Sequence, residues 1–348
     1  MKTDGFRGRD FLALKDYTRE EIETILDVAW DLKRRYALRE PHDHLLRGRT
    51  LFMIFYNQSL RTRNSFEAGM TQLGGHAHYL DPDKIYRPAM EGYEVAYTTE
   101  RVSDVARVLS RMGDAISIRC YGEPVGWVYG AAHAMQREFA HWADIPIINM
   151  ECDKYHPCQG LADIMTVKDK FGTFRGARFV MSWAYSPSVH KPLAVPQSAV
   201  TAATLMGMDV VLAHPKGMEL DDEVLAICRE NARRYGGSFE ISHDMREAFR
   251  GAHVVYPKAW TCKEFIPPFN SKPELEKSQK VFDANKDWIC DAEKIKLIDP
   301  EGIYLHCLPC DRGYEVTDEV IDGPRSAVFD QAENRLHAQK AVLALTMR

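Results

Sequence analysis

Apolar and polar positions in the first half of the chain alternate between the periods of helices and of buried strands. Amphipathic spacing predicts helices at 17–38, 65–75, 99–112 and 130–142. Short apolar runs predict strands at 51–56, 76–81, 115–120 and 145–150. The first helix has a start signal, because Thr18 and Glu21 form a capping-box pattern. Strands and helices in turn are typical of a parallel sheet covered by helices.

The same alternation restarts in the second half of the chain. Helices are predicted at 160–172, 196–206, 221–235 and 333–348. Strands are predicted at 178–183, 209–214, 238–241, 252–257 and 303–309. Two runs of strand–helix units predict an α/β fold with two doubly wound parallel-sheet domains, each with its own core. The boundary is expected near 150–160, and a length of 348 residues fits two domains of roughly 100–200 residues.

Composition excludes several classes of protein. Hydrophobic residues make up 45% and charged residues 27%, which is typical of a soluble globular protein. A net charge of -5 provides no broad basic field for nucleic acid, so any anion site must be local. No apolar stretch approaches the roughly 18–20 residues of a membrane span, and the N-terminus does not resemble a secretory signal. Eight scattered cysteines favour a reducing, cytoplasmic compartment over a disulfide scaffold.

Polar chemistry is concentrated at the ends of predicted strands. The chain has neither GxGxxG nor GxxxxGK[ST], so a dinucleotide fold or a P-loop is not supported. Ligands of open parallel sheets bind beyond the carboxyl ends of the strands. Four such segments carry candidate chemistry, and they are Ser59–Arg63, Arg119, His156–Gln159 and His306–Pro309.

The segment Ser59–Arg63 lies between a predicted strand and a predicted helix. Backbone N–H groups at a helix start favour an anion, and the hydroxyls of Ser59 and Thr62 add donors. Arg61 and Arg63 add charge, since a guanidinium can bind two oxygens of one phosphate. The segment therefore predicts a phosphate site. The alternative is an N-cap serine followed by two solvated arginines.

Arg119 and His156–Gln159 are candidate partners for the rest of such a ligand. Arg119 ends an apolar strand, so it either borders the fold or points at a ligand. A histidine at 156 can donate to a polarised carbonyl, and Gln159 can bind an amide through its donor and acceptor together. A helix-entry turn with exposed polar residues is the alternative.

The run His306-Cys307-Leu308-Pro309 is followed by Cys310, which makes a CxxC pattern. Backbone carbonyls here could receive an NH2 group. Cys307 is either a nucleophile or a packed thiol. Zinc would need two more ligands, for which Cys152, Cys158 and His156 are candidates at unusual spacing, and a redox pair is the remaining alternative.

Together these segments resemble the carbamoyltransferase family of aspartate and ornithine carbamoyltransferases. SLRTR at 59–63 matches its S-T-R-T-R loop with Leu60 in place of threonine, HPCQ at 156–159 matches HPxQ, and HCLP at 306–309 matches the ornithine side. INMEC, YPKAW and AENRLHAQKA resemble the knotted branch, which contains N-acetyl- and N-succinylornithine carbamoyltransferases. The resemblance implies a trefoil knot through 183–196 in the second domain.

The resemblance also implies roles for the two domains and for individual residues. Residues 1–155, with the C-terminal helix 333–348 packed back on them, would bind carbamoyl phosphate, and residues 156–332 would bind an amino-acid acceptor. The carbamoyl phosphate contacts would be Ser59, Leu60, Arg61, Thr62, Arg119, His156, Gln159, Cys307, Leu308 and Arg335, of which Arg119, His156, Gln159 and Cys307 are assigned to catalysis. The acceptor contacts would be Glu151, Lys258 and Glu315. No metal or organic cofactor is expected, and the family forms homotrimers.

Some departures from the family pattern leave the acceptor open. The D-x-x-x-S-M-G of ornithine enzymes is missing, and Glu315 occupies the place of a carboxylated lysine in acetylornithine enzymes. The acceptor is therefore expected to be ornithine or an N-acylornithine, or else an oxamate- or ureido-type compound of nitrogen catabolism. Segment 81–93, with Lys84, Arg87 and Glu91, lies where family members receive a loop from a neighbouring subunit. A non-catalytic carbamoyl phosphate-binding relative is a further alternative.

Overall fold

The computed structural model describes residues 3–268 and 272–347. Its internal contacts divide the chain into two units. The first unit runs to Val125 and also contains Gly130–Cys158 and the chain from Arg335 onward. The second unit contains Gly126–Tyr129 and Gln159–Asn334. Helices α5 (Pro157–Phe171) and α12 (Val328–Thr346) both run across this division.

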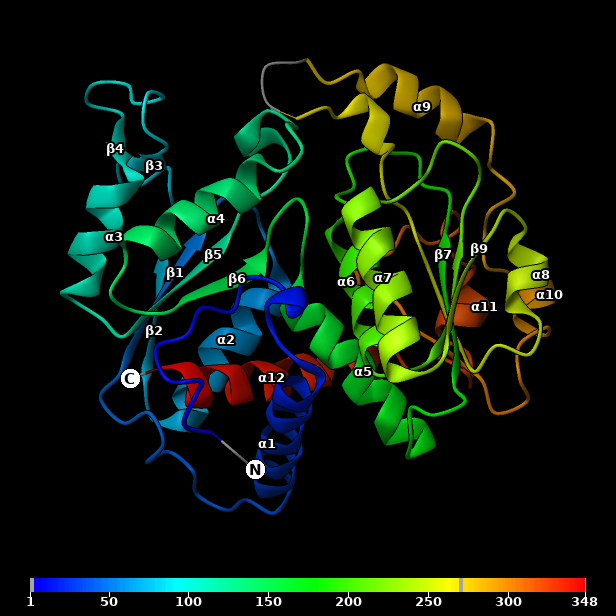
Figure 1. Ribbon diagram of the computed structural model, residues 1–348, viewed down its shortest axis with the longest axis horizontal. Helices are drawn as coiled ribbons and strands as arrows, with labels where there is room; N and C mark the ends of the chain where they lie inside the picture. The colour runs from blue at the N-terminus through cyan, green and yellow to red at the C-terminus, as the bar shows by residue number, and fades with distance from the viewer. Residues whose placement is uncertain (1–2, 269–271, 348) are drawn as a thin grey trace. The chain divides into compact units, whose positions relative to one another are not determined.

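A parallel sheet forms the centre of the first unit (Figure 1). Its strand order is β2-β1-β5-β6, with the bounds β1 (Thr50–Phe55), β2 (His76–Leu80), β5 (Ala115–Arg119) and β6 (Ile147–Glu151). Its helices are α1 (Arg19–Ala37), α2 (Leu60–Leu73), α3 (Val102–Ser110), α4 (Ala131–Trp142) and the C-terminal part of α12. Helices α3 and α4 lie on one side of the sheet, and α1, α2 and α12 lie on the other.

Local sequence signals explain where two helices of the first unit begin and end. The predicted capping box of α1 is confirmed, because Thr18 Oγ1 accepts from Glu21 N at 3.3 Å and Glu21 Oε2 accepts from Thr18 N at 2.8 Å. Ser59 caps α2 by accepting from Thr62 N at 3.2 Å. Gly74 ends α2 in the left-handed conformation at φ 85°, and a Cβ there would lie 1.7 Å from the Asp43 carbonyl oxygen, so only glycine fits.

The second unit is built around another parallel sheet, with strand order β11-β10-β7-β8-β9. Its strands are β7 (Arg178–Trp183), β8 (Asp209–Ala213), β9 (Ser238–Ser242), β10 (Val254–Lys258) and β11 (Ile303–Tyr304). Its further helices are α6 (Ala194–Leu205), α7 (Asp222–Tyr235), α8 (Met245–Phe249), α9 (Leu275–Asp283), α10 (Ala292–Ile295) and α11 (Asp318–Ile321). Helices α6 and α7 cover one face, and α8 and α10 lie on the other (Figure 1).

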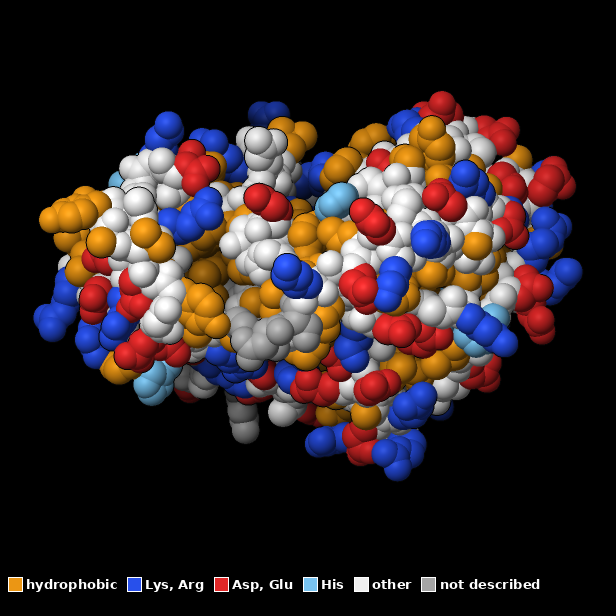
Figure 2. Space-filling view, turned by 90° about the horizontal axis from the view of Figure 1, so that it is seen from above, with side chains coloured by type: hydrophobic (Ala, Val, Ile, Leu, Met, Phe, Trp, Pro, Cys, Tyr) orange, Lys and Arg blue, Asp and Glu red, His pale blue; other side chains and the backbone are white. Residues whose placement is uncertain are grey.

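The prediction of two helix-covered parallel sheets is confirmed, and the C-terminal part of α12 belongs to the first unit as expected. Each unit buries an apolar core of its own, because the central strands carry aliphatic residues on both faces. The knot and the roles of the two domains stay predictions. None of the described helices is long and apolar enough to cross a membrane. On the face in Figure 2, basic and acidic side chains are intermixed.

Two predicted elements are shorter in the structure. Residues 99–112 were predicted as one helix, but Thr99–Arg101 form strand β4 beside β3 (Arg87–Ala89), and the helix begins at Val102. The strand predicted at 303–309 ends at Tyr304, and Leu308 has a φ of 53°, which is left-handed rather than extended. The backbone therefore turns within the HCLP segment.

Candidate functional site

Four segments of the first unit bring basic side chains together around His156. Arg61 lies in the first turn of α2, Arg119 ends β5, His156 lies between β6 and α5, and Arg335 lies on α12. We call Arg61, Arg119 and Arg335 the arginine cluster. Burial lowers the pKa of His156 well below its usual value, and the positive charges of Arg335, Arg119 and Arg61 lower it further. These three guanidiniums therefore surround a histidine that is neutral at physiological pH.

Glu151 is the acidic member of this site. Its carboxylate forms an ion pair with Arg119 in which both side chains are buried, and its Oε2 lies 3.7 Å from His156 Nε2. Arg119 Nη2 also donates to the Tyr121 hydroxyl at 3.0 Å. Burial by itself would lower the pKa of Arg119, but the Glu151 carboxylate outweighs it and the pKa is raised. Arg119 is therefore held as a cation in a fixed orientation.

The N-terminus of α2 provides hydrogen-bond donors next to these charges. Arg335 Nη2 donates to Thr62 Oγ1 at 2.9 Å, and both residues are buried. Backbone N–H groups at the start of a helix carry partial positive charge, which favours an anion. Leu60 is 74% exposed, and because leucine has no polar side-chain atom, its backbone N–H is the only donor that it can contribute.

Arg63 does not join the arginine cluster, which corrects the sequence-based expectation. Its Nε donates to Glu67 Oε1 at 2.9 Å, and its guanidinium lies 4.0 Å from the centre of the Tyr79 ring. Residues two apart in an α-helix point about 200° away from each other, so Arg61 and Arg63 cannot share one face of α2. Arg63 is an exposed side chain on a different face of α2 from Arg61.

The charge balance of the site suits a phosphorylated ligand. Three guanidiniums and the Glu151 carboxylate leave two net positive charges; Arg119, Arg335 and Glu151 are buried, and Arg61 is partly exposed. A phosphate carries a charge of about -1.5 to -2 at neutral pH, so this site can neutralise it. Charge-assisted hydrogen bonds to its oxygens are stronger here than in water.

The other predicted carbamoyl contacts belong to the second unit. Gln159 lies in the first turn of α5, where its Nε2 donates to Asp163 Oδ1 at 2.7 Å. Cys307 and Leu308 follow β11, and the Leu308 N–H donates to His306 Nδ1 at 2.9 Å. Gln159 is buried, whereas Cys307 and Leu308 are partly exposed. The carbonyl groups of the HCLP segment therefore lie on a turn that is stabilised by the hydrogen bond between the Leu308 N–H and His306 Nδ1.

The CxxC pattern does not form a metal site in the structure. None of the eight cysteines, all of which lie in the described residues, forms a disulfide, and Cys307 and Cys310 are partly exposed while the other six are buried. Burial raises the pKa of the Cys310 thiol to about 11. Within residues 3–268 and 272–347, no group of three or more His, Cys, Asp or Glu side chains is arranged to hold a metal ion.

Glu315 and Lys258 lie at the end of β10 in the second unit. Glu315 is fully buried, where Oε1 accepts from Ala259 N and Oε2 accepts from Asp311 N, both at 2.7 Å. Burial would raise the pKa of this carboxyl, but His306 and two nearby lysines hold the pKa well below its usual range. Lys258 Nζ donates to Ala259 O at 3.1 Å. Glu315 thus holds two loops together as a permanent anion.

Sequence reasoning missed several residues that support these groups. Asp163 and Gln331 are fully buried behind Gln159, and Gln331 Nε2 donates to Asp163 Oδ1 at 2.6 Å. Asp163 lies four residues after Gln159 on one helix face, which is a detectable spacing. Gln331 lies far along the chain, so no local pattern could have connected it to the others.

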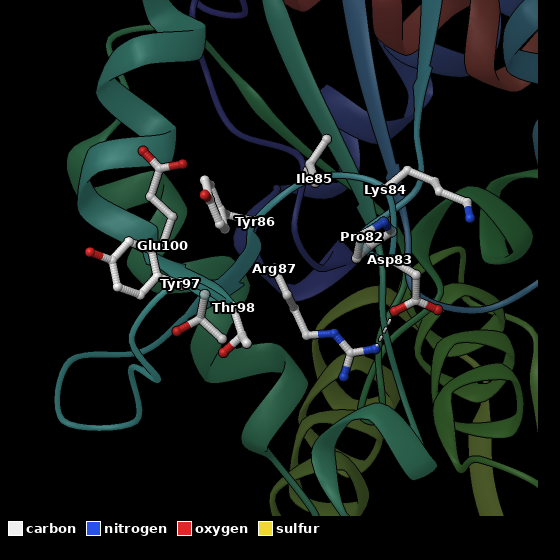
Figure 3. A pocket seen from close by; sticks show the side chains of 10 residues that line it. Pro82, Asp83, Lys84, Ile85, Tyr86, Arg87, Tyr97, Thr98 and Glu100 are labelled. Carbon is white, nitrogen blue, oxygen red and sulfur yellow. Dashed lines mark hydrogen bonds and ion pairs between the residues drawn. The ribbon is translucent and has the colours of Figure 1, made fainter.

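Segment 81–93 contributes to a separate hollow on the surface of the first unit (Figure 3). The hollow is lined by residues 82–87 and 97–100. Arg87 points to Asp83, whose carboxylate accepts from Arg87 Nη2 at 2.8 Å, and Tyr97 is 92% exposed. Glu91 pairs with Arg101 at 3.2 Å. The acceptor role expected of Lys84, Arg87 and Glu91 stays a prediction.

Family models match most of the chain. A model described as the aspartate/ornithine carbamoyltransferase carbamoyl-P binding domain matches residues 9–169, and one described as the Asp/Orn binding domain matches residues 193–346. The chain belongs to the aspartate/ornithine carbamoyltransferase family. Its reaction class is carbamoyl transfer, as the SLRTR, HPCQ and HCLP segments implied.

Relatives within this family include enzymes for two different acceptors. The anabolic ornithine carbamoyltransferase of Pyrococcus furiosus is 43% identical over 98% of this chain and 96% of its own length. The N-acetylornithine carbamoyltransferase of Xanthomonas campestris pv. campestris is 38% identical over 97% of each chain. A crystal structure of acetylornithine transcarbamylase complexed with acetylcitrulline superposes with a TM-score of 0.88 at 36% identity, covering 98% of this chain and 99% of the other.

Proposed function

We propose that the protein transfers the carbamoyl group of carbamoyl phosphate to the amine of an ornithine-type amino acid and releases phosphate. The observation that carries this proposal is the arginine cluster around a buried, neutral His156. A phosphorylated donor needs positive charge for its phosphate, and its carbonyl oxygen needs hydrogen-bond donors. The first unit supplies both from the ends of β5 and β6 and from two helices.

In the proposed complex, the phosphate binds to the arginine cluster, to Ser59 and Thr62, and to the backbone N–H of Leu60. Arg335 is already oriented by Thr62 Oγ1, and Arg119 by Glu151 and Tyr121. Gln159, Cys307 and Leu308 receive the carbamoyl NH2 group through their carbonyl oxygens, in keeping with the family motifs HPCQ and HCLP. Cys307 takes part through its backbone carbonyl.

The proposed reaction is an attack by a neutral amine on the carbamoyl carbon. The carbonyl oxygen becomes an oxyanion, and Arg119 and His156 donate to it. The C–O bond to phosphate then breaks, and the arginine cluster stabilises the charge that builds up on the leaving group. The amine loses one proton to solvent or to the departing phosphate. Binding both substrates in one site supplies much of the remaining rate enhancement.

We propose Glu151 and Lys258 as the groups that orient the acceptor, and Glu315 as the group that holds Lys258 and its loop. Both Glu315 oxygens are taken by backbone N–H groups, which supports an indirect role. Lys258 is buried at the end of β10 with its ammonium near the Ala259 carbonyl, which suits a contact with an acyl or carboxylate oxygen. Ornithine and N-acetylornithine are the first candidates.

A screen of acceptors tests this function. Purified protein is given carbamoyl phosphate with ornithine, N-acetylornithine, N-succinylornithine, oxamate or a ureido compound, and phosphate release above the rate without acceptor is measured. We expect release with an ornithine-type amine and formation of the matching ureido product by mass spectrometry. Release only with oxamate would favour the non-ornithine alternative, and carbamoyl phosphate binding without any release would favour a non-catalytic relative.

The pH dependence is a second expected result. The pKa of His156 lies well below its usual value, so this residue stays neutral across the assay range and adds no inflection near pH 6.5. The acceptor amine has an ordinary pKa near that of lysine, about 10.4, and reacts only when neutral. kcat/KM is therefore expected to rise about tenfold per pH unit from pH 7 to 9. A plateau that begins near pH 6.5 would contradict it.

We also propose a homotrimer in which segment 81–93 meets a neighbouring subunit. Exposed aromatic and aliphatic side chains gather in and after this segment, namely Ile85, Tyr86, Tyr93, Val95 and Tyr97. Such side chains favour contact with another surface. A cytoplasmic location is proposed as well, because eight scattered cysteines that form no disulfide suit a reducing compartment.

A further inference from the structure

A chain of buried hydrogen bonds in the second unit connects Gln159 to the HCLP segment. Asp163 Oδ1 accepts from Gln159 Nε2 at 2.7 Å and from Gln331 Nε2 at 2.6 Å. Gln331 Oε1 in turn accepts from the backbone N–H of His306 at 2.9 Å. Gln159, Asp163, Gln331 and His306 are all at most 1% exposed. Two segments that both carry proposed carbamoyl contacts are therefore joined through the side chains of Asp163 and Gln331.

Both polar atoms of the Gln331 side-chain amide take part in these hydrogen bonds. The Asp163 carboxylate can only accept and the His306 backbone N–H can only donate, so the amide of Gln331 has one allowed orientation. Because the bonds are buried, a lost partner would not be replaced by bulk water. The location of the His306 backbone is thus fixed by Gln331 and, through it, by Asp163.

The ring of His306 extends the chain in the other direction. Its Nδ1 accepts from the Leu308 N–H at 2.9 Å, so Nδ1 carries no proton and the ring proton lies on Nε2. Nε2 faces Glu315 Oε2 at 3.4 Å, a close polar contact that lacks hydrogen-bond geometry. Glu315 then accepts from the N–H groups of Ala259 and Asp311. The imidazole therefore lies between the Leu308 peptide, to which it is hydrogen-bonded, and the carboxylate that holds the Ala259 peptide.

We propose that Asp163, Gln331, His306 and Glu315 form a positioning relay for carbamoyl transfer. The relay fixes the side-chain amide of Gln159 and the peptide of Leu308 relative to each other, so that both carbonyl oxygens can receive the same carbamoyl NH2 group. At its far end it fixes the peptide of Ala259, which follows the proposed acceptor contact Lys258. None of the four residues touches the substrates. The inference rests on the proposed function of Gln159 and Leu308.

A matched pair of substitutions tests the relay against a purely structural role. Gln331→Glu replaces the buried amide that faces Asp163. Asn334→Asp makes the same chemical change one turn later on α12, where Asn334 Nδ2 donates to Thr166 at 2.9 Å and Asp169 at 3.0 Å. Both variants lose stability. Only Gln331→Glu is expected to lower kcat, by about 10²-fold as for a small misplacement of reacting groups, with KM for carbamoyl phosphate nearly unchanged.

Equal kcat values in these two variants would overturn the relay. If Gln331→Glu does not fold, two substitutions of His306 take its place. His306→Asn keeps an acceptor near the position of Nδ1 for the Leu308 N–H, and His306→Gln keeps a donor near Nε2 for Glu315. The relay predicts lower kcat for His306→Gln than for His306→Asn, because the Leu308 peptide carries the carbamoyl contact. The reverse order would contradict it.

A measurement that does not need activity separates this inference from the proposed function. In NMR spectra of protein labelled with 15N-histidine, the His306 ring should show a proton on Nε2. It should not titrate between pH 6 and 9, with or without carbamoyl phosphate. The signal is assigned by its loss in His306→Asn. A proton on Nδ1, or an imidazolium, would overturn the relay even in an active enzyme. A wild-type protein without carbamoyl transfer would instead overturn the proposed function, whatever the His306 spectrum shows.

Discussion

Replacing Arg119 with alanine is expected to weaken the binding of carbamoyl phosphate by about 1.5–3 kcal/mol, the range for a hydrogen bond to a charged group. Arg119 is buried, positively charged and oriented by Glu151 and Tyr121 before any ligand binds. The variant should also unfold more easily, because Glu151 loses the cation beside it, and breaking a buried ion pair costs about 3–5 kcal/mol. Isothermal titration calorimetry and urea denaturation measure these two effects separately.

Two comparison variants distinguish loss of binding from loss of stability. The double variant Arg119→Ala/Glu151→Ala removes the carboxylate that Arg119→Ala leaves unpaired, so it should recover part of the stability and none of the affinity. Arg63→Ala removes an exposed guanidinium that pairs with Glu67, and it should change the affinity by less than about 0.5 kcal/mol. Equal affinities in Arg119→Ala and Arg63→Ala would refute the phosphate site.

The fold could be predicted where the hydrophobic pattern was strong. Both central sheets could be predicted from short apolar runs such as 51–56 and 178–183. Strands that are buried on both faces are apolar at nearly every position, and these runs stand out in the sequence. Short elements were missed. Helix α8 spans only Met245–Phe249, and β4 takes Thr99–Arg101 from the start of a predicted helix. Their conformations depend on contacts with residues distant in sequence, and the spacing of apolar residues within a short segment does not indicate such contacts.

The candidate site could be predicted where its residues stand at the ends of strands. Parallel strands of one sheet share a carboxyl edge, so Arg119 and the segments at 59–62 and 156 were expected to meet, and within the first unit they do. Arg63 was misassigned because the segment was read as a loop, whereas it is the first turn of α2, in which alternate residues diverge. The burial of Glu315 depends on two loops distant in sequence, which no motif reveals.

The two carboxylates expected to contact the acceptor, Glu151 and Glu315, differ in their surroundings. Glu151 is paired with the Arg119 guanidinium, which is itself a proposed ligand contact, so we expect ligand binding to change the partners of Glu151. Glu315 is held by two backbone N–H groups, so its partners belong to the fold itself. Glu151 is thus held by a side chain and Glu315 by the backbone. Substrate specificity should respond more to the loops that Glu315 holds than to its charge.

Replacing His156 with alanine is expected to lower kcat by about 10²–10³-fold, the usual cost of removing one donor to a developing oxyanion. Affinity for carbamoyl phosphate should fall much less, because the arginine cluster holds the phosphate and stays intact. His156→Gln restores an N–H donor of similar reach, so it should recover part of kcat. Steady-state kinetics with a saturating acceptor, together with the dissociation constant of carbamoyl phosphate, separate the two parameters.

The pH profile shows whether His156 acts as a neutral donor or as a base. A base would have to be free of its proton yet able to take one up, and its loss would remove an inflection from the profile of kcat/KM. Burial and three nearby guanidiniums hold the pKa of His156 well below its usual value, which favours the neutral imidazole as a donor over a role as base. His156→Ala should therefore shift the whole profile down without changing its slope between pH 7 and 9. A changed slope would show that His156 takes up the proton of the attacking amine.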